Sequence, residues 1–116
     1  MSESYIASIT LTSGARLIGE VVEETDIWLT VKRPVGIRIH THPVGVETYD
    51  WQPFSMETEW SFNKSFLFTK ITKINLYGYY IYQSAVDKIY EDKRTNEVHS
   101  RDWFEQVHAK NETVFN

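Results

Sequence analysis

Alternating apolar and polar positions near the start of the chain predict three β-strands joined by tight turns. The strands are expected over residues 5–11, 16–23 and 27–32, and in each of them every second side chain would face a core. Gly14 supplies a left-handed turn between the first two strands, and Gly19 a side-chain-free bend within the second. Short strands with such turns and bends predict the beginning of a small, strongly curved β-barrel.

The extended pattern continues less regularly as far as residue 82. Pro34 is expected to interrupt or end the third strand, because proline has no N–H group to donate to a ladder. Five further extended runs are expected, over residues 35–42, 46–52, 59–62, 66–74 and 76–82, with a short break at residues 63–65.

Beyond Gln83 the spacing of apolar residues becomes helical. A first helix is expected over residues 85–93, with Ser84 as its cap, and a second over residues 101–110. Thr95 and Asn96 are expected to separate the two helices.

The length and composition of the chain are those of one globular domain. We expect its 116 residues to form a barrel over residues 1–83 and a helical extension of the same domain over residues 84–116. Cysteine is absent, which excludes disulfides and thiolate zinc sites. No apolar run approaches the roughly 18 residues of a membrane span, and the first residues do not resemble a signal peptide. We therefore expect a cytoplasmic protein without membrane contact.

No arrangement typical of an enzyme or a cofactor site is present. The sequence contains no G-x-S-x-G, no phosphate-binding glycine loop and no H-E-x-x-H, and Ser13, Ser55 and Ser65 lie at turns rather than in the setting of a nucleophile. His40 and His42 would share one face of a strand, but a third metal ligand is not evident beside them. The sequence predicts no catalysis, no cofactor and no metal site.

The charge pattern gives a weak indication of nucleic-acid binding. The formal net charge of −4 argues against a dedicated nucleic-acid surface. Within this acidic chain, Lys64 beside Asn63 is the best candidate for contacting a single strand, and Trp28 could stack on a base. The basic pair Lys32 and Arg33 could add to such a surface. The competing interpretation is that Lys64 is a solvated turn residue and that the aromatic rings fill a core or an interface.

Two sets of residues resemble the Sm-like family. Gly14 and Gly19, followed by an acidic turn and a third strand, resemble the first Sm motif. The second motif has two placements, one over residues 60–68 with Lys64 in its turn, the other over residues 74–81 with Gly78. More specifically, the segment around Pro34, the run Tyr49-Asp-Trp-Gln-Pro-Phe-Ser55 and a late helix resemble Sm-like proteins of marine cyanophages, over roughly residues 5–93.

This resemblance implies a fold, an assembly and a ligand. The fold would be a strongly bent five-stranded antiparallel Sm-like (SH3-like) barrel, and copies would associate into a closed ring, pentamer to heptamer. The implied ligand is single-stranded RNA, and the resemblance supplies one position for it, Lys64 in the first placement of the second motif. Asn63, Trp28, Lys32 and Arg33 complete the candidate RNA-binding residues from the charge and aromatic pattern alone. A phage-encoded protein would act in the host cytoplasm. Family members that bind RNA usually carry asparagine after the acidic turn, where this chain reads Asp26-Ile-Trp28. A structural or protein-interaction ring that does not bind RNA is therefore the alternative.

Overall fold

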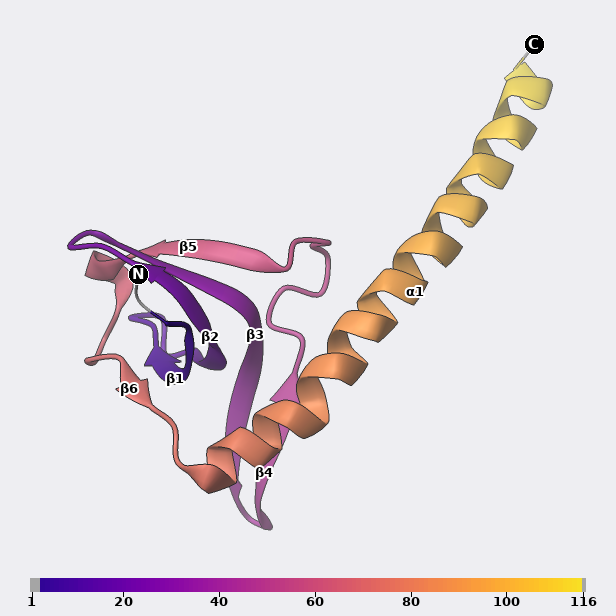
Figure 1. The fold of residues 1–116 in the computed structure, drawn as a ribbon. Coiled ribbons are helices and arrows are strands. Elements are labelled where there is room, and N and C mark those ends of the chain that lie inside the picture. Colours follow the sequence, from indigo (N-terminus) through magenta and orange to yellow (C-terminus); the bar gives the residue numbers. More distant parts are fainter. Residues whose placement is uncertain (1–2, 116) are drawn as a thin grey trace.

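The computed structural model describes the backbone of residues 3–115 and the side chains of residues 3–95. It contains an antiparallel sheet and one long C-terminal helix (Figure 1). The elements are β1 (Tyr5–Thr10), β2 (Arg16–Glu24), β3 (Trp28–Thr41), β4 (Val44–Tyr49), β5 (Glu59–Asn63), the 3-10 turn η1 (Lys64–Phe66), β6 (Thr72–Lys73) and α1 (Leu76–Phe115).

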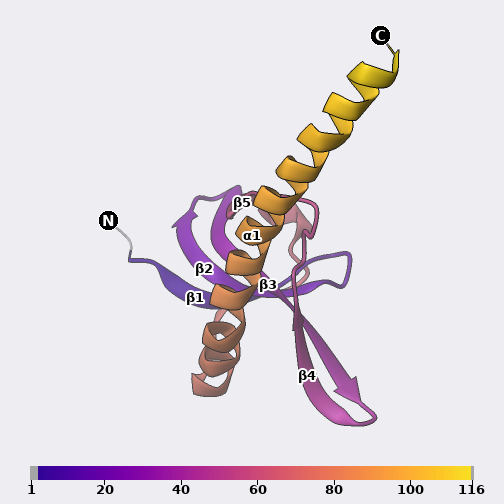
Figure 2. The ribbon, with the colours of Figure 1, turned by 90° about the vertical axis from the view of Figure 1, so that its right-hand side faces the viewer.

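Strand β3 is the centre of the sheet because it pairs with three others. The strand order is β4-β3-β2-β1-β6, and β5 pairs with β3 outside this path. The first part of β3 pairs with β5, from Trp28↔Asn63 to Lys32↔Glu59, and its second part pairs with β4. The β3–β4 hairpin extends away from the rest of the sheet in both ribbon views (Figures 1 and 2). The predicted mostly-β fold is confirmed, with six strands rather than five, in a sheet that curls but does not close.

Two glycines have the roles that the sequence predicts. Gly14 has φ of +94° in the turn between β1 and β2, a conformation that other residues rarely adopt. At Gly19 a Cβ atom would lie 2.4 Å from Cγ1 of Val31, and the β2–β3 register shifts between Ile18 and Glu20. The bend in β2 is possible because Gly19 has no side chain, which lets the Val31 side chain of β3 approach its backbone closely.

Pro34 interrupts the third strand, as the sequence predicts, but does not end it: β2 pairs with Lys32 and Val35 of β3 and with neither residue between them. β3 continues through it with a sharp bend, in which Arg33 has φ of +48° and Pro34 is fully buried. The Arg33 N–H donates to the carbonyl of Thr58 at 2.6 Å. The carbonyls of Arg33 and Pro34 accept hydrogen bonds from the hydroxyl groups of Tyr82 and Tyr90 of α1. The strand survives the proline because side chains from the helix replace the lost ladder partners.

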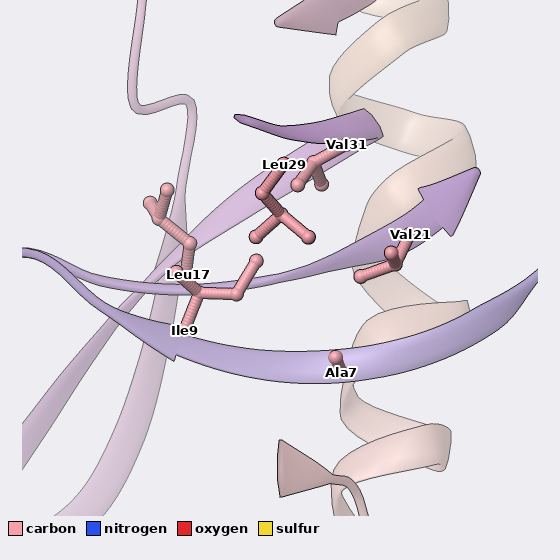
Figure 3. Close-up of a cluster of buried hydrophobic side chains, with 6 residues drawn as sticks. All are labelled: Ala7, Ile9, Leu17, Val21, Leu29 and Val31. Atoms are coloured by element: carbon pink, nitrogen blue, oxygen red, sulfur yellow. The ribbon is translucent and has the colours of Figure 1, made fainter. Parts of the chain in front are cut away.

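Buried side chains form two clusters on opposite faces of the sheet, because neighbouring residues such as Leu17 and Ile18 point in opposite directions. One cluster fills the concave face (Figure 3) and the other is covered by α1. The concave cluster consists of Ala7, Ile9, Leu17, Val21, Leu29 and Val31, and the other of Ile18, Val35, Tyr82, Ala85 and Val86.

The C-terminal part is one helix, so the predicted strand over residues 76–82 and the break at Thr95 and Asn96 are both wrong. The cap is Asn75, whose side chain accepts the Gly78 N–H at 2.8 Å, whereas the Ser84 hydroxyl donates to Ile81 inside the helix. Threonine and asparagine lower helix stability only by a few tenths of a kcal/mol, which does not stop a helix already anchored by packing. The second half of α1 extends beyond the sheet (Figure 1).

Candidate binding surface at the open edges of the sheet

Three of the predicted site residues meet at one end of the β3–β5 pair. Trp28 and Asn63 are directly opposite each other, and the Lys64 N–H donates to the carbonyl of Ile27 at 2.7 Å. The Asn63 side chain accepts the N–H of Ser65 at 2.9 Å and so begins η1. The turn after β2 and the turn after β5 are therefore neighbours. The other placement of the second motif, around Gly78, lies in the first turns of α1 and forms no strand–turn–strand unit.

Lys32 and Arg33 do not join this group. Lys32 is exposed and pairs with Glu59 at the opposite end of the β3–β5 ladder. The Arg33 guanidinium lies at the β3 bend, 3.7 Å from the carboxylate of Asp87 in α1. The five predicted RNA contacts are thus divided between two ends of the strand pair.

Lys64 is neutralised by a carboxylate. Its Nζ atom lies 2.6 Å from Oε2 of Glu24, and this hydrogen bond is the main reason why the pKa of Glu24 lies below its usual value. The pair lines a hollow of about 290 Å³ together with Glu3, Glu23 and Asp26. A phosphate at this point would have to displace Glu24 and approach three more carboxylates, which like-charge repulsion opposes.

A second hollow, of about 400 Å³, lies beside the outer edge of β5 and carries no charged side chain in its lining. The rings of Trp28 and Phe66 are 48% and 60% exposed, and Ser61 and Asn63 of β5 line the same hollow. Its remaining lining consists of Leu11, Thr12, Ser13 and Phe62. This surface suits a flat apolar group or an extended backbone better than an anion.

The outer edge of β5 is unpaired in the described structure, because β5 contacts only β3. The Arg33 N–H donates to Thr58 and the Lys64 N–H to Ile27, and hydrogen-bonded pairs occupy every second position of an antiparallel ladder. The backbone N–H and C=O groups of Glu59, Ser61 and Asn63 therefore point away from β3.

The outer edge of β6 is likewise unpaired among the described residues, since β6 contacts only β1. Thr72 lies opposite Ser8, and the Ile74 N–H donates to the carbonyl of Ile6 at 3.3 Å. By the same alternation the N–H and C=O of Lys73 point outward. The sequence does not show which residues of these edges point outward, because that follows only from the pairing.

The β3–β4 hairpin presents a third edge with a different character. Glu47 accepts hydrogen bonds from Arg38 at 3.2 Å and contacts His40 at 2.8 Å. The contact with His40 is the main cause of the lowered pKa of Glu47. The charges of the hairpin thus satisfy one another. Among the described residues no group of three or more histidine, aspartate or glutamate side chains could hold a metal ion.

Lys93 is a buried residue that the sequence reasoning missed. Its side chain is 4% exposed, and Nζ lies 3.1 Å from the Asp50 carboxylate while donating to the carbonyls of Gln52 and Ser55 at 2.7 and 2.6 Å. The ring of Trp60 lies 5.8 Å from the same ammonium group. Lys93 therefore ties the loop before β5 to α1 and sets the position of β5. Its helical spacing from Tyr82, Val86 and Ile89 is the sequence feature that could have indicated its burial.

Two further observations bear on the kind of protein. In the described part of the chain, no helix combines the length and the apolar character needed to cross a membrane. No protein-family model matches this chain, and no curated protein matches it.

Proposed function

We propose that this chain is a non-enzymatic Sm-like module that assembles with copies of itself into a closed ring. The observation that carries the proposal is the pair of different open edges on one curled sheet, β5 on β3 and β6 on β1. Two different edges on the same molecule favour a head-to-tail contact, and such a contact closes into a ring when its rotation is fixed.

The physical reason for assembly is that open strand edges are unstable in solution. Unpaired backbone groups on an edge recruit other strands, and a protein must cover, charge or pair them. Exposed aromatic side chains lie beside these edges, with Phe68 72% and Phe66 60% exposed. A neighbouring copy would cover both the backbone groups and the rings.

The proposed Sm-like fold is supported by the order of elements along the chain. After the bent strands β1 to β3 comes β4, which in this interpretation is an addition that extends β3 into the projecting hairpin. The chain then continues through β5, the 3-10 turn η1 and β6, which returns to pair with β1. An isolated bridge between Leu11 and Leu67 lies where the chain begins its return to β1.

Light scattering across the micromolar range tests the assembly. The proposal expects a constant mass equal to about five to seven copies of the chain. A mass that stays at that of one chain at every concentration contradicts it.

RNA binding is a second candidate, favoured by the exposed rings of Trp28 and Phe66 around the uncharged hollow. Aromatic rings of this kind stack on bases of a single strand. The Glu24–Lys64 pair argues in the other direction, because it neutralises the lysine that follows Asn63 of the same hollow. Titration of short A-rich and U-rich RNA at several salt concentrations, with Trp28→Ala as the matched variant, separates an RNA-binding ring from a purely structural one.

A further inference from the structure

We propose that this protein binds the carboxyl-terminal end of an extended peptide from a partner protein. The binding site is the notch between the β1–β2 turn (residues 11–15) and residues 38–41 of β3, where Arg16 and Arg38 hold the terminal carboxylate of the peptide. The notch lies on a different edge of the sheet from the outer edges of β5 and β6, so a peptide and a neighbouring copy do not compete for it.

The notch exists because β2 begins too late to accompany the whole of β3. The first residue of β2, Arg16, lies opposite Ile37, whereas the pairing of β3 with β4 continues as far as Thr41. In the described structure, residues 38–41 therefore have a strand partner on one side only, and the hairpin that they belong to runs away from the β1–β2 turn (Figure 2). Every second residue of this stretch directs its backbone N–H and C=O groups towards the empty side, where an added strand can pair with them.

A hollow of about 410 Å³ occupies the notch, a size within the range of ligand pockets. It is lined by residues 14–16 at the turn, by residues 37–39 of β3 and by Tyr49 of β4. Two of these residues are arginines and none carries a carboxylate, although the chain as a whole has a net charge of −4. The lining therefore favours a ligand with a negative charge.

The two arginines differ in what they already contact. Arg16 is exposed and takes part in no ion pair among residues 3–95. Arg38 donates to the carboxylate of Glu47 at 3.2 Å, and its guanidinium carbon lies 4.6 Å from the centre of the Tyr49 ring. A guanidinium group has five N–H donors, so Arg38 is held in place by these two contacts and still has donors for a second carboxylate. Arg16 supplies the charge that is not yet neutralised.

Strand direction and charge together select the carboxyl terminus of the peptide. A peptide antiparallel to β3 runs from the level of Thr41 towards Arg38, in line with β2, and its last residue arrives beside Arg16. Its terminal carboxylate then meets both guanidinium groups, as in other sites that capture a chain end on a sheet edge. A parallel peptide would place its amino terminus at the same point, where two cations repel an ammonium group.

The exposed side chains of the hairpin select the residue before the terminus. With the last residue of the peptide opposite Arg38, the residue before it lies opposite Ile39, whose side chain is 55% exposed. Ile39 is itself paired with Val46 of β4, which is 38% exposed. Aliphatic β-branched side chains pack well against one another across strands, so we expect valine or isoleucine at this position of the peptide.

Retention of a randomised peptide pool on the immobilised full chain tests the proposal. N-acetylated tetrapeptides are offered once with a free terminal carboxylate and once as terminal amides, and the bound peptides are identified by mass spectrometry. We expect about tenfold greater retention of the free-acid pool, enriched in valine and isoleucine at the position before the last. Equal retention of the two pools overturns the proposal. Retention of only those members that contain aspartate or glutamate, in both pools alike, assigns the arginines to side-chain carboxylates and overturns it as well.

Variants and hydrogen exchange locate the binding. Arg16→Gln should reduce the retention of the free-acid pool about tenfold, and so should Arg38→Gln, with circular dichroism to check that each variant is folded. Arg94→Gln is the matched control, because Arg94 is an exposed arginine of α1 that pairs with Glu91. The most enriched peptide should slow hydrogen exchange of the amides of residues 38–41 in the wild-type protein.

An equal effect of all three variants, or protection elsewhere than residues 38–41, overturns the site. These results do not depend on the assembly. A chain that stays monomeric in light scattering but retains the free-acid pool contradicts the ring alone, and a ring that retains neither pool contradicts the peptide site alone.

Discussion

The hydroxyl group of Tyr90 donates a hydrogen bond of 2.7 Å to the backbone carbonyl of Pro34. The two residues are 56 positions apart, and the contact joins α1 to the sharpest bend of the sheet. Tyr82 makes the equivalent bond to the carbonyl of Arg33 at 2.9 Å. A buried carbonyl without a partner is costly, so the helix allows β3 to bend where its ladder is interrupted. The same bend turns the second part of β3 towards β4 and leaves the first part to receive β5.

Tyr90→Phe should lower the free energy of unfolding by about 1–3 kcal/mol, since it leaves the Pro34 carbonyl buried without a donor. Urea denaturation monitored by tryptophan fluorescence measures the change. Tyr80→Phe is the matched control, because Tyr80 lies in the same helix and is 63% exposed. Equal losses in the two variants would show that the hydroxyl of Tyr90 contributes nothing specific.

The stability of the fold should fall at high pH. Burial raises the pKa of Tyr82 to about 12, and burial also raises the pKa of Tyr90. In the unfolded chain these groups ionise near a pKa of about 10, so the folded state binds the protons more tightly. The contribution of the two protonated hydroxyl groups to the free energy of unfolding is complete below pH 10 and is lost as the pH rises towards 12. Urea midpoints measured from pH 8 to pH 11.5 should decline, and the decline should be smaller in the Tyr82→Phe/Tyr90→Phe variant, although ionisation of the other tyrosines also contributes.

Lys93→Met should destabilise the protein by about 3 kcal/mol. The change leaves the carboxylate of Asp50 and the carbonyls of Gln52 and Ser55 without the ammonium group that they share. Lys88→Met is the control, because Lys88 is an exposed lysine of the same helix. Hydrogen exchange should also show faster exchange of β5 amides in Lys93→Met than in Lys88→Met, since the loop before β5 loses its anchor. Unchanged exchange in β5 would contradict the proposed anchoring role.

Gly19→Ala should destabilise the fold by about 1–3 kcal/mol, because the new methyl group would lie 2.4 Å from Cγ1 of the buried Val31 and 3.1 Å from Cα of Pro34. Thermal denaturation measures the loss. Gly45→Ala is the matched control in the projecting hairpin, where a Cβ atom would have no neighbour within 4 Å. A Gly19→Ala protein as stable as Gly45→Ala would mean that β2 can move away from β3 at little cost.

The sequence predicted local features well and tertiary ones poorly. The first strands, Gly14 and Gly19 follow from alternation and from glycine stereochemistry, which act within a few residues. The sequence predicted an interruption at Pro34 but could not show that the strand continues beyond it, because the groups that replace its ladder partners lie on α1. The start of α1 was misread because a tyrosine-rich segment suits a strand equally well, and only packing against the sheet decides between them.

In the candidate site, too, local features were predictable and tertiary contacts were not. Asn63, Lys64 and Trp28 lie together at one end of the β3–β5 pair. The partner that neutralises Lys64 is Glu24, 40 positions earlier in the chain, and no local pattern indicates that contact. Lys32 and Arg33 are separated from Lys64 because the pairing of β3 with β5 runs antiparallel and places them at its opposite end.

Glu24→Gln should raise the affinity for single-stranded RNA if the hollow around Trp28 and Phe66 accepts bases. The substitution keeps the shape of the side chain and removes the charge that pairs with Lys64 at 2.6 Å, so that the ammonium group becomes free to contact a phosphate. Fluorescence anisotropy with a short U-rich strand at several salt concentrations measures the effect. The gain should disappear in Lys64→Ala/Glu24→Gln. Glu23→Gln is the matched control, because it removes one charge from the same hollow and leaves the Glu24–Lys64 pair intact. Equal gains in Glu23→Gln and Glu24→Gln would assign the effect to the overall negative charge rather than to the release of Lys64.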